Sequence, residues 1–210
     1  MLVALVVLGT VPSLALAGPK DPTARHNAAD MRLARSIALT RADFAAGWAE
    51  EKGNGGASSD ADCSAYPDES KLIQTGSVDP TFDSPRGGAA SVDSEVDVYE
   101  TTAMALVDWR NVNLRRLRTC ITELLVKMTG VKVTITAAAK PVPVHAERTL
   151  AFSFELTGKG AVPYDIDVVA LGKGRTSVLL SAAGPKGSYD RSLLTPLARL
   201  LAQRLAARVS

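Results

Sequence analysis

The sequence predicts an α+β domain with a mostly antiparallel sheet of about six strands and helices packed on it. Two observations carry this prediction. Apolar residues recur at spacings of three, four and seven over residues 101–128, and again at three to four over 193–205, as in amphipathic helices. Period-2 alternation separated by short glycine turns runs through residues 131–182, which indicates consecutive antiparallel strands. The expected order of elements is α-α-β-β-α-β-β-β-β-α.

Length and composition narrow the class of protein. The chain has 210 residues, of which 46% are hydrophobic, and this suits one domain with a proper core. The formal net charge is only +2, so electrostatics give no reason to expect a nucleic acid or an anionic membrane as partner. Aromatic residues make up 5%, too few for base-stacking platforms. We therefore expect no nucleic-acid partner.

The first seventeen residues have the features of a secretory signal peptide. Residues 2–8 form an apolar run too short to span a membrane, and Ala15-Leu16-Ala17 is a cleavage signal before Gly18. No Lys or Arg precedes this run, so an upstream start codon and a buried N-terminal strand or helix stay open as alternatives. The expected organisation is a signal peptide over 1–17, a flexible lead-in over 18–23 and a single α+β domain over 24–210. We expect a secreted or cell-envelope protein with no transmembrane span in the mature chain.

The expected compartment determines how the two cysteines, Cys63 and Cys120, are interpreted. An oxidising destination favours one intramolecular bridge, and two free buried thiols are the alternative. A metal site would need two more ligands, and His26 and His145 have no suitable spacing. We expect a Cys63–Cys120 disulfide, no metal and no other cofactor.

The boundaries of the elements come from capping and turn residues. Helices are expected over residues 23–38, 101–128 and from 190 or 195 onward, the last with Arg199, Arg204 and Arg208 on a solvated face. A compact helix start is expected where Thr40 caps and Asp43 answers as its acidic partner. Strands are expected over 71–78, 91–99, 131–136, 150–156, 164–170 and 176–182.

One row of carboxylates stands out within the strand expected at 91–99. Asp93, Glu95 and Asp97 alternate with valines and so share one face of that strand. Such a row resembles an acid/base or metal site, and it also resembles a solvent face that discourages edge pairing. We favour the solvent face, because no histidine or second carboxylate cluster lies nearby in the sequence.

Residues 39–48, Leu-Thr-Arg-Ala-Asp-Phe-Ala-Ala-Gly-Trp, look like the L-x-x-x-D-x-x-x-G-W segment of small secreted actinobacterial proteins. A loop cysteine, strands, and a helix bearing Trp109 and Cys120 follow in the same order. Over residues 24–208 the chain thus resembles the PsbP-like α+β fold of exported actinobacterial lipoproteins and the related extracellular sensor domains of their serine/threonine kinases. It differs from them in lacking a lipobox cysteine and a kinase or membrane segment. The resemblance implies an envelope or extracellular domain with a cleft for a ligand or partner, and it carries over no functional residues.

No catalytic motif is present: the sequence contains no Gly-x-Ser-x-Gly, no His-Glu-x-x-His and no Ser-x-x-Lys in a credible context. We therefore expect a non-enzymatic binding or sensor-like domain with an apolar cleft for a small hydrophobic molecule or an envelope protein. Residues that could line the cleft, each of which also fits a core position, are Trp48, Tyr66, Trp109 and Tyr164. A structural or protein-interaction role in the cell envelope is the alternative, and a carboxylate-dependent hydrolase ranks third.

The leader prediction can be tested by N-terminal sequencing. Protein collected from culture medium or envelope should begin at Gly18, because the small residues at 15 and 17 fit a signal-peptidase site. A chain found in the cytoplasm and still starting at Met1 would overturn the assignment of compartment.

Overall fold

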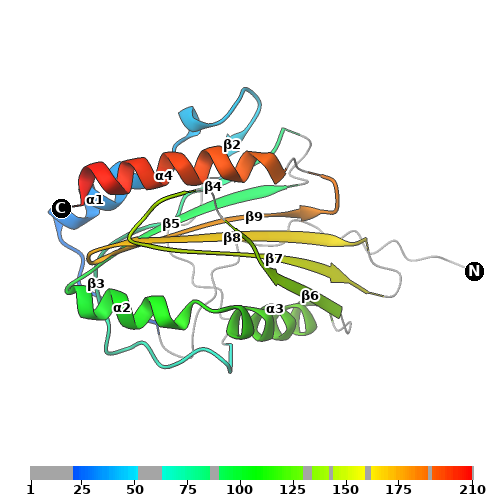
Figure 1. Ribbon diagram of the computed structural model, residues 1–210, viewed down its shortest axis with the longest axis horizontal. Coiled ribbons are helices and arrows are strands. Elements are labelled where there is room, and N and C mark those ends of the chain that lie inside the picture. Colours follow the sequence, from blue (N-terminus) through cyan, green and yellow to red (C-terminus); the bar gives the residue numbers. More distant parts are fainter. Residues whose placement is uncertain are drawn as a thin grey trace, which may run out of the picture.

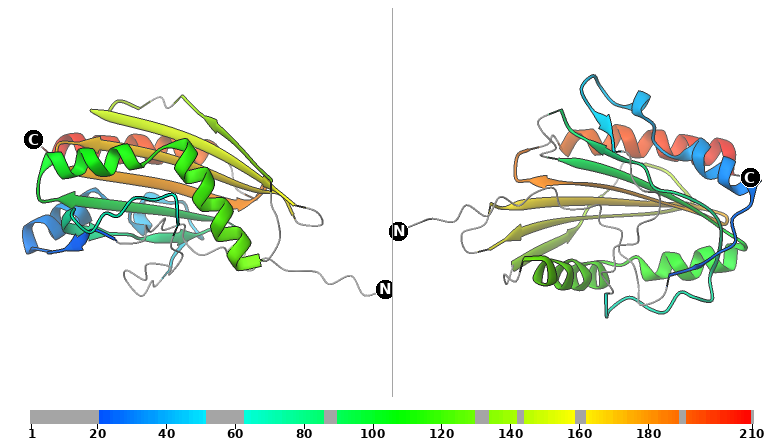
Figure 2. Two further views of the ribbon diagram at one scale, coloured as in Figure 1. Left: turned by 90° about the horizontal axis from the view of Figure 1, so that it is seen from below. Right: turned by 180° about the vertical axis from the view of Figure 1, so that it is seen from behind.

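The computed structural model describes residues 21–51, 63–85, 90–129, 134–141, 144–158, 162–188 and 191–209. In these ranges one sheet lies between two layers of helices (Figure 1). The helices are α1 (Ala28–Ile37), α2 (Thr102–Asn111), α3 (Leu114–Thr129) and α4 (Leu194–Arg208). None of the helices in these ranges is both long and apolar enough to cross a membrane. Figure 2 shows α1 and α4 on one face of the sheet and α2 and α3 on the other.

The sheet has nine strands in the described ranges, three more than expected, and its α+β class is confirmed. The strands are β1 (Thr23–Ala24), β2 (Ala49–Glu50), β3 (Ile73–Val78), β4 (Thr81–Asp83), β5 (Ser91–Tyr99), β6 (Thr134–Ala139), β7 (Arg148–Thr157), β8 (Tyr164–Lys173) and β9 (Thr176–Pro185). Their order is β1-β3-β5-β9-β8-β7-β6, with β4 paired to β5 beside this path and β2 paired to β4. All pairs are antiparallel except β1 with β3. The three added strands, β1, β2 and β4, are two or three residues long.

The first core lies between the sheet and the α1/α4 layer. Leu197, Leu201 and Leu205 recur every fourth residue on α4 and are buried, as the sequence predicts. They pack with Ile37 of α1 and with the valines of β5. The apolar stripe of α4 and the apolar row of β5 therefore form one core.

The helix layer on the other face of the sheet consists of two helices, α2 and α3, and not of the single helix predicted over residues 101–128. Val112 has an extended backbone conformation, and two helices result. Thr101 caps α2 by accepting a hydrogen bond from the amide of Met104 (3.2 Å), and Asn113 accepts one from the amide of Arg116 (3.1 Å) at the start of α3. The apolar period continues across this break, so periodicity alone does not show the second cap.

Helix α1 begins at Ala28 and not at the expected residue 23. The side chain of Asn27 accepts hydrogen bonds from the amides of Ala29 (3.1 Å) and Asp30 (3.0 Å), which makes Asn27 the N-cap. Residues 23–24 form β1 beside β3 instead. The chain thus reaches α1 through a strand.

The capping arrangement predicted at residues 40–43 is confirmed, but the solvated role of Arg204 is wrong. Thr40 donates its amide hydrogen to Asp43 at 2.7 Å around a short 3₁₀ helix, Arg41–Asp43. Arg204 of α4 pairs with Asp43 (2.6 Å) and donates to the carbonyl of Ala38 (2.8 Å). An arginine on the polar side of α4 therefore holds the end of α1, which helical periodicity does not reveal.

A second arginine, Arg175, joins the start of α1 to the turn between β8 and β9. Arg175 forms a bidentate pair with Asp30, at 2.6 and 2.9 Å, and also donates to the carbonyl of Tyr99 (2.9 Å). These hydrogen bonds hold the pKa of Asp30 well below its ordinary value. Gly76 of β3 permits the close approach, because a Cβ there would lie 2.5 Å from the carbonyl carbon of Asp30.

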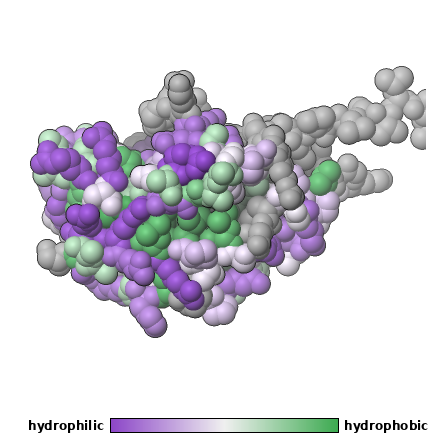
Figure 3. Space-filling view, turned by 90° about the horizontal axis from the view of Figure 1, so that it is seen from above, coloured by the Kyte–Doolittle hydropathy of each residue, from purple (hydrophilic) through white to green (hydrophobic). Residues whose placement is uncertain are grey.

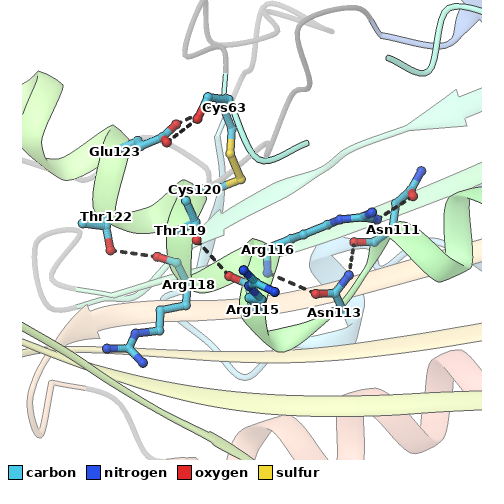
Figure 4. Close-up of a disulfide and its surroundings, with 11 residues drawn as sticks. Cys63, Asn111, Asn113, Arg115, Arg116, Arg118, Thr119, Cys120, Thr122 and Glu123 are labelled. Carbon is cyan, nitrogen blue, oxygen red and sulfur yellow. Dashed lines mark hydrogen bonds between the residues drawn. A yellow bond between two sulfur atoms is a disulfide. The ribbon is translucent and has the colours of Figure 1, made fainter. Parts of the chain in front are cut away.

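The predicted Cys63–Cys120 disulfide is present, with Cα atoms 5.1 Å apart and both residues buried. Beside it Glu123 accepts hydrogen bonds from the amide (2.9 Å) and hydroxyl (2.5 Å) of Ser64 (Figure 4). The bridge fastens the segment that begins at Cys63 to α3.

We expect Arg175→Ala to lower the free energy of unfolding by about 3 kcal/mol, because it leaves the largely buried Asp30 without its cation. Urea unfolding followed by circular dichroism measures this. Arg35→Ala, at an exposed position of α1, is the control and should change stability by less than about 0.5 kcal/mol. Equal losses in both variants would contradict this role for Arg175.

Removing the disulfide should lower stability by roughly 2–5 kcal/mol, since the bridge closes a long loop. The double variant Cys63→Ser/Cys120→Ser and the reduced wild type should lose similar amounts in urea unfolding. Intact mass after alkylation without reductant is the accompanying check. Two alkylated thiols in native protein would show that the bridge is absent.

Candidate functional site

Six carboxylates gather between β5 and α2 and form what we call the acidic cluster. Its members are the buried Glu69, Asp93 and Asp97, the half-buried Glu95 and Asp108, and Asp79, which is exposed in the turn after β3. Asp93 and Asp97 are only 7% and 8% exposed, so the expectation of a solvent face for this row is wrong. Strand β5 pairs with β9 on one side and with β3 and β4 on the other, and α2 lies across this face. The row is therefore interior at Asp93 and Asp97 and half-buried at Glu95.

Hydroxyl and amide donors from neighbouring strands hold the row in place. Ser181 of β9 donates to Asp93 at 3.0 Å, since the two residues are register partners. Gln74 of β3 donates its side-chain amide to Asp97 at 2.7 Å. Both of these donors are neutral groups that orient the carboxylates.

Asp108 is the carboxylate that α2 contributes to the cluster. Its carboxylate accepts hydrogen bonds from Ser177 of β9 (2.9 Å) and from the hydroxyl of Tyr99. Ala105 and Asn111, three residues before and after it on α2, are both buried, so Asp108 lies on the helix face toward the sheet. The helix is thus attached to the sheet partly through a carboxylate.

Glu69 belongs to the segment that follows Cys63, and it joins the cluster from there. Asn111 donates to Glu69 at 2.5 Å, and the carbonyl oxygen of the same amide accepts from Arg116 at 2.7 Å. Figure 4 shows this Asn111–Arg116 contact at the break between α2 and α3. The chain Glu69–Asn111–Arg116 therefore couples the segment after Cys63 to both helices.

Burial and mutual repulsion raise the pKa values of the cluster. Burial is the main cause that raises the pKa of Glu69 to about 7 and that of Asp97 to about 7, with the charge of Asp108 adding to both. The adjacent Asp97 carboxylate raises the pKa of Glu95 well above its ordinary value, and the two carboxyls hydrogen-bond to each other. Burial also raises the pKa of Asp108. Near neutral pH the cluster therefore holds protons that isolated carboxyls would release.

Two cations, Arg116 and Arg148, lie at the margin of the cluster. Arg116 is engaged with Asn111, as above, and Arg148 lies 5.7 Å from the ring centre of Trp109. Arg148 donates to the carbonyl of Gly174 (2.9 Å) and to Glu147 (2.6 Å), and its charge partly lowers the pKa of Asp108. Within the described ranges no group of three or more His, Cys, Asp or Glu is arranged to hold a metal ion.

The four aromatic residues predicted to line a cleft do not meet in one place. Trp48 lies on the α1/α4 side, half-buried and 5.0 Å from the ring of Phe44. Tyr66 is buried beside the disulfide, on the α2/α3 side, and Trp109 is half-buried on α2. Tyr164, whose pKa burial raises to about 12, lies at the start of β8 and packs against the core between α3 and strands β6–β8. Tyr66 and Trp109 flank the acidic cluster, whereas Trp48 lies across the sheet from it.

The α1/α4 side of the molecule carries an apolar surface. Figure 3 shows apolar side chains gathered in the middle of this face among hydrophilic ones. The half-buried apolar residues that pack on the first core are Leu33, Trp48, Val78, Ala146, Leu193 and Leu200. These half-buried apolar residues and the acidic cluster are thus on opposite sides of the sheet.

Sequence reasoning missed Glu69, Asp79 and Asp108, which come from three segments outside the strand expected at 91–99. Asp108 shares a helix face with Ala105 and Asn111, and two of these three residues are polar, so this face does not stand out as an apolar stripe. No local signal marks Glu69 either, because its partner Asn111 lies more than forty residues away.

No family model matches this chain, and no curated protein matches it in sequence. Among solved structures it is similar to the extracellular domain of PknH from Mycobacterium tuberculosis, with a TM-score of 0.38 and 14% sequence identity. The match covers 63% of this chain and 66% of the PknH domain, just under two thirds of it. A similarity this weak carries no argument about function, so the sensor-like role and the PsbP-like resemblance stay predictions.

Stability should decrease as the pH rises through the window set by the cluster. Glu69 and Asp97 have pKa values of about 7 in the folded protein against ordinary values of 4.5 and 3.8. Between about pH 4 and 7 the folded state therefore binds more protons than the unfolded chain, and the free energy of unfolding should fall with pH and level off above that window. Asp97→Asn should raise it by on the order of 2 kcal/mol at about pH 8 and flatten the profile.

Urea unfolding across the pH range measures this profile. Asp83→Asn, a half-exposed carboxylate on β4, is the matched control and should leave the slope unchanged. The ion pairs of Asp30 and Asp43 act oppositely, because their pKa values are lowered and their contribution is lost only in stronger acid. A wild-type profile that rises from acid to neutral pH would show that the cluster is ionised and stabilised.

Proposed function

We propose that this chain is a non-enzymatic, extracytoplasmic binding domain of the sensor type whose ligand-binding site is the acidic cluster with Tyr66 and Trp109. The ligand is a small molecule with a positively charged amine and an apolar body. This modifies the purely hydrophobic ligand expected from the sequence, because the carboxylates supply a charge that the ligand should complement.

The carboxylates buried under α2 carry the proposal. Burying ionisable groups destabilises a fold, and proteins tolerate this mainly where the groups have a task. Burial raises the pKa values of Glu69 and Asp97, which is the direction expected when the charged form is disfavoured. An ammonium group that binds here would relieve it by allowing the carboxyls to ionise.

Aromatic side chains on the same side fit the rest of such a ligand. Trp109 lies one position after Asp108 on α2, and Tyr66 lies three before Glu69. An aromatic ring stabilises an adjacent organic cation through its face, as the guanidinium of Arg148 over Trp109 illustrates. The disulfide supports an extracytoplasmic location, since such bridges persist in oxidising compartments.

Titration calorimetry with an alkyltrimethylammonium ion below its micellar concentration tests the proposal. Binding at mildly acidic pH should release protons, which appear as a dependence of the observed heat on the ionisation enthalpy of the buffer. Asp108→Asn should weaken binding about tenfold or more, whereas Asp83→Asn should not. Equal binding of the matching alkyl sulfate or alcohol, or an unaltered affinity in Asp108→Asn, would contradict it.

The apolar surface on the α4 side favours a second candidate, a protein-interaction role in the envelope. In that case Trp48→Ala should abolish recovery of one specific envelope protein after crosslinking in the native host, while the fold stays intact. The hydrogen-bonded pair Glu95 and Asp97 favours a carboxyl-dependent hydrolase as the third, since paired carboxyls sharing a proton serve as acid and base in such enzymes.

A further inference from the structure

We propose that β6 is a dimerisation edge, along which two copies of this chain join their sheets by antiparallel β6–β6 pairing. Strand β6 closes one end of the sheet, and in the part of the chain that the structure describes it pairs only with β7 (Figures 1 and 2). This inference is independent of the acidic cluster.

The hydrogen-bonding groups on the free edge can be assigned. The amide of Lys140 donates to the carbonyl of Ala151 at 2.9 Å, which fixes the alternation of the ladder between β6 and β7. The even-numbered residues of β6 therefore direct their backbone groups to β7. Ile135, Ala137 and Ala139 direct theirs outward, each offering one N–H and one C=O to a further strand.

Strand β6 also lacks the features that protect the other edges. At the opposite end of the sheet β1 is only two residues long, and β2 is equally short and includes Glu50. By contrast β6 has six residues, Thr-Ile-Thr-Ala-Ala-Ala, without a charge or a proline. Four of them are exposed. A long uncharged edge of this kind is a template for strand addition.

A second copy fits this edge better than an unrelated strand, because the edge is self-complementary. A two-fold axis perpendicular to the sheet at Ala137 places Ala137 opposite itself and Ile135 opposite Ala139 of the second copy, so all outward groups pair. Each opposed pair then contains a small side chain. Lys140 falls opposite Thr134 of the second copy, on the sheet face that also carries Glu155, so no like charges meet.

Sedimentation velocity of the full chain over a concentration series tests the proposal. Wild type should show a reversible monomer–dimer equilibrium. Ala137→Pro removes an outward N–H and keeps the ladder to β7, so it should weaken association about tenfold or more without loss of folded structure. Ala138→Pro is the matched comparison: its N–H points to β7, so this variant should lower the melting temperature of the monomer itself.

Thr136→Lys is the second variant, needed if Ala137→Pro fails to fold. A lysine at this exposed position gains Glu155 as a cross-strand neighbour within the monomer and adds positive charge to both sides of the dimer junction. It too should weaken association. Wild type that stays monomeric throughout the series, or dimers that persist unchanged in Thr136→Lys, would overturn the proposal.

Discussion

Strand β5 is hydrogen-bonded along both of its edges, and the rest of the structure depends on this constraint. Because β9 lies on one side and β3 and β4 on the other, β5 is an interior strand, and its two rows of side chains point to the two faces of the sheet. Helices cover both faces of the sheet. The valine row enters the first core, and the carboxylate row is forced under α2. The acidic cluster is thus a consequence of topology.

Much of the fold follows from the sequence because local signals were consistent. Alternation located β5, β7, β8 and β9, and the leucine stripe located α4. The failures have physical causes: the apolar period runs across Val112, so the cap at Asn113 was missed, and a two-residue strand such as β1 has no period at all. Arg204 was placed in solvent because periodicity describes a helix face and not the reach of a long side chain.

The candidate site was less predictable than the fold. Its carboxylates come from β5, α2 and the segment after Cys63, and only the sheet register brings these together. Alternation correctly grouped Asp93, Glu95 and Asp97, but whether that group is wet depends on which strands flank β5. A sequence read alone gives no information on that order. The disulfide and the Glu69–Asn111 contact then close the cluster from the side opposite the sheet.

Helix α2 covers the centre of the sheet, where the groups beneath it are carboxylates, and Asp108 of α2 adds another. At low pH these carboxyls are protonated, so covering them carries little charge penalty. At higher pH a bound cation would offset their negative charge. Under the proposed function, the stability of the domain would depend on occupancy of this site, which is a property suited to a sensor.

The most direct measurement of this account is carbon-13 NMR titration of the side-chain carboxyls in the ligand-free protein. Glu69 and Asp97 should titrate with midpoints near pH 7, and Asp97→Asn should lower the midpoint of its neighbour Glu95. Midpoints of Glu69 and Asp97 close to their ordinary values of 4.5 and 3.8 would contradict the central claim that these groups are held protonated beneath α2.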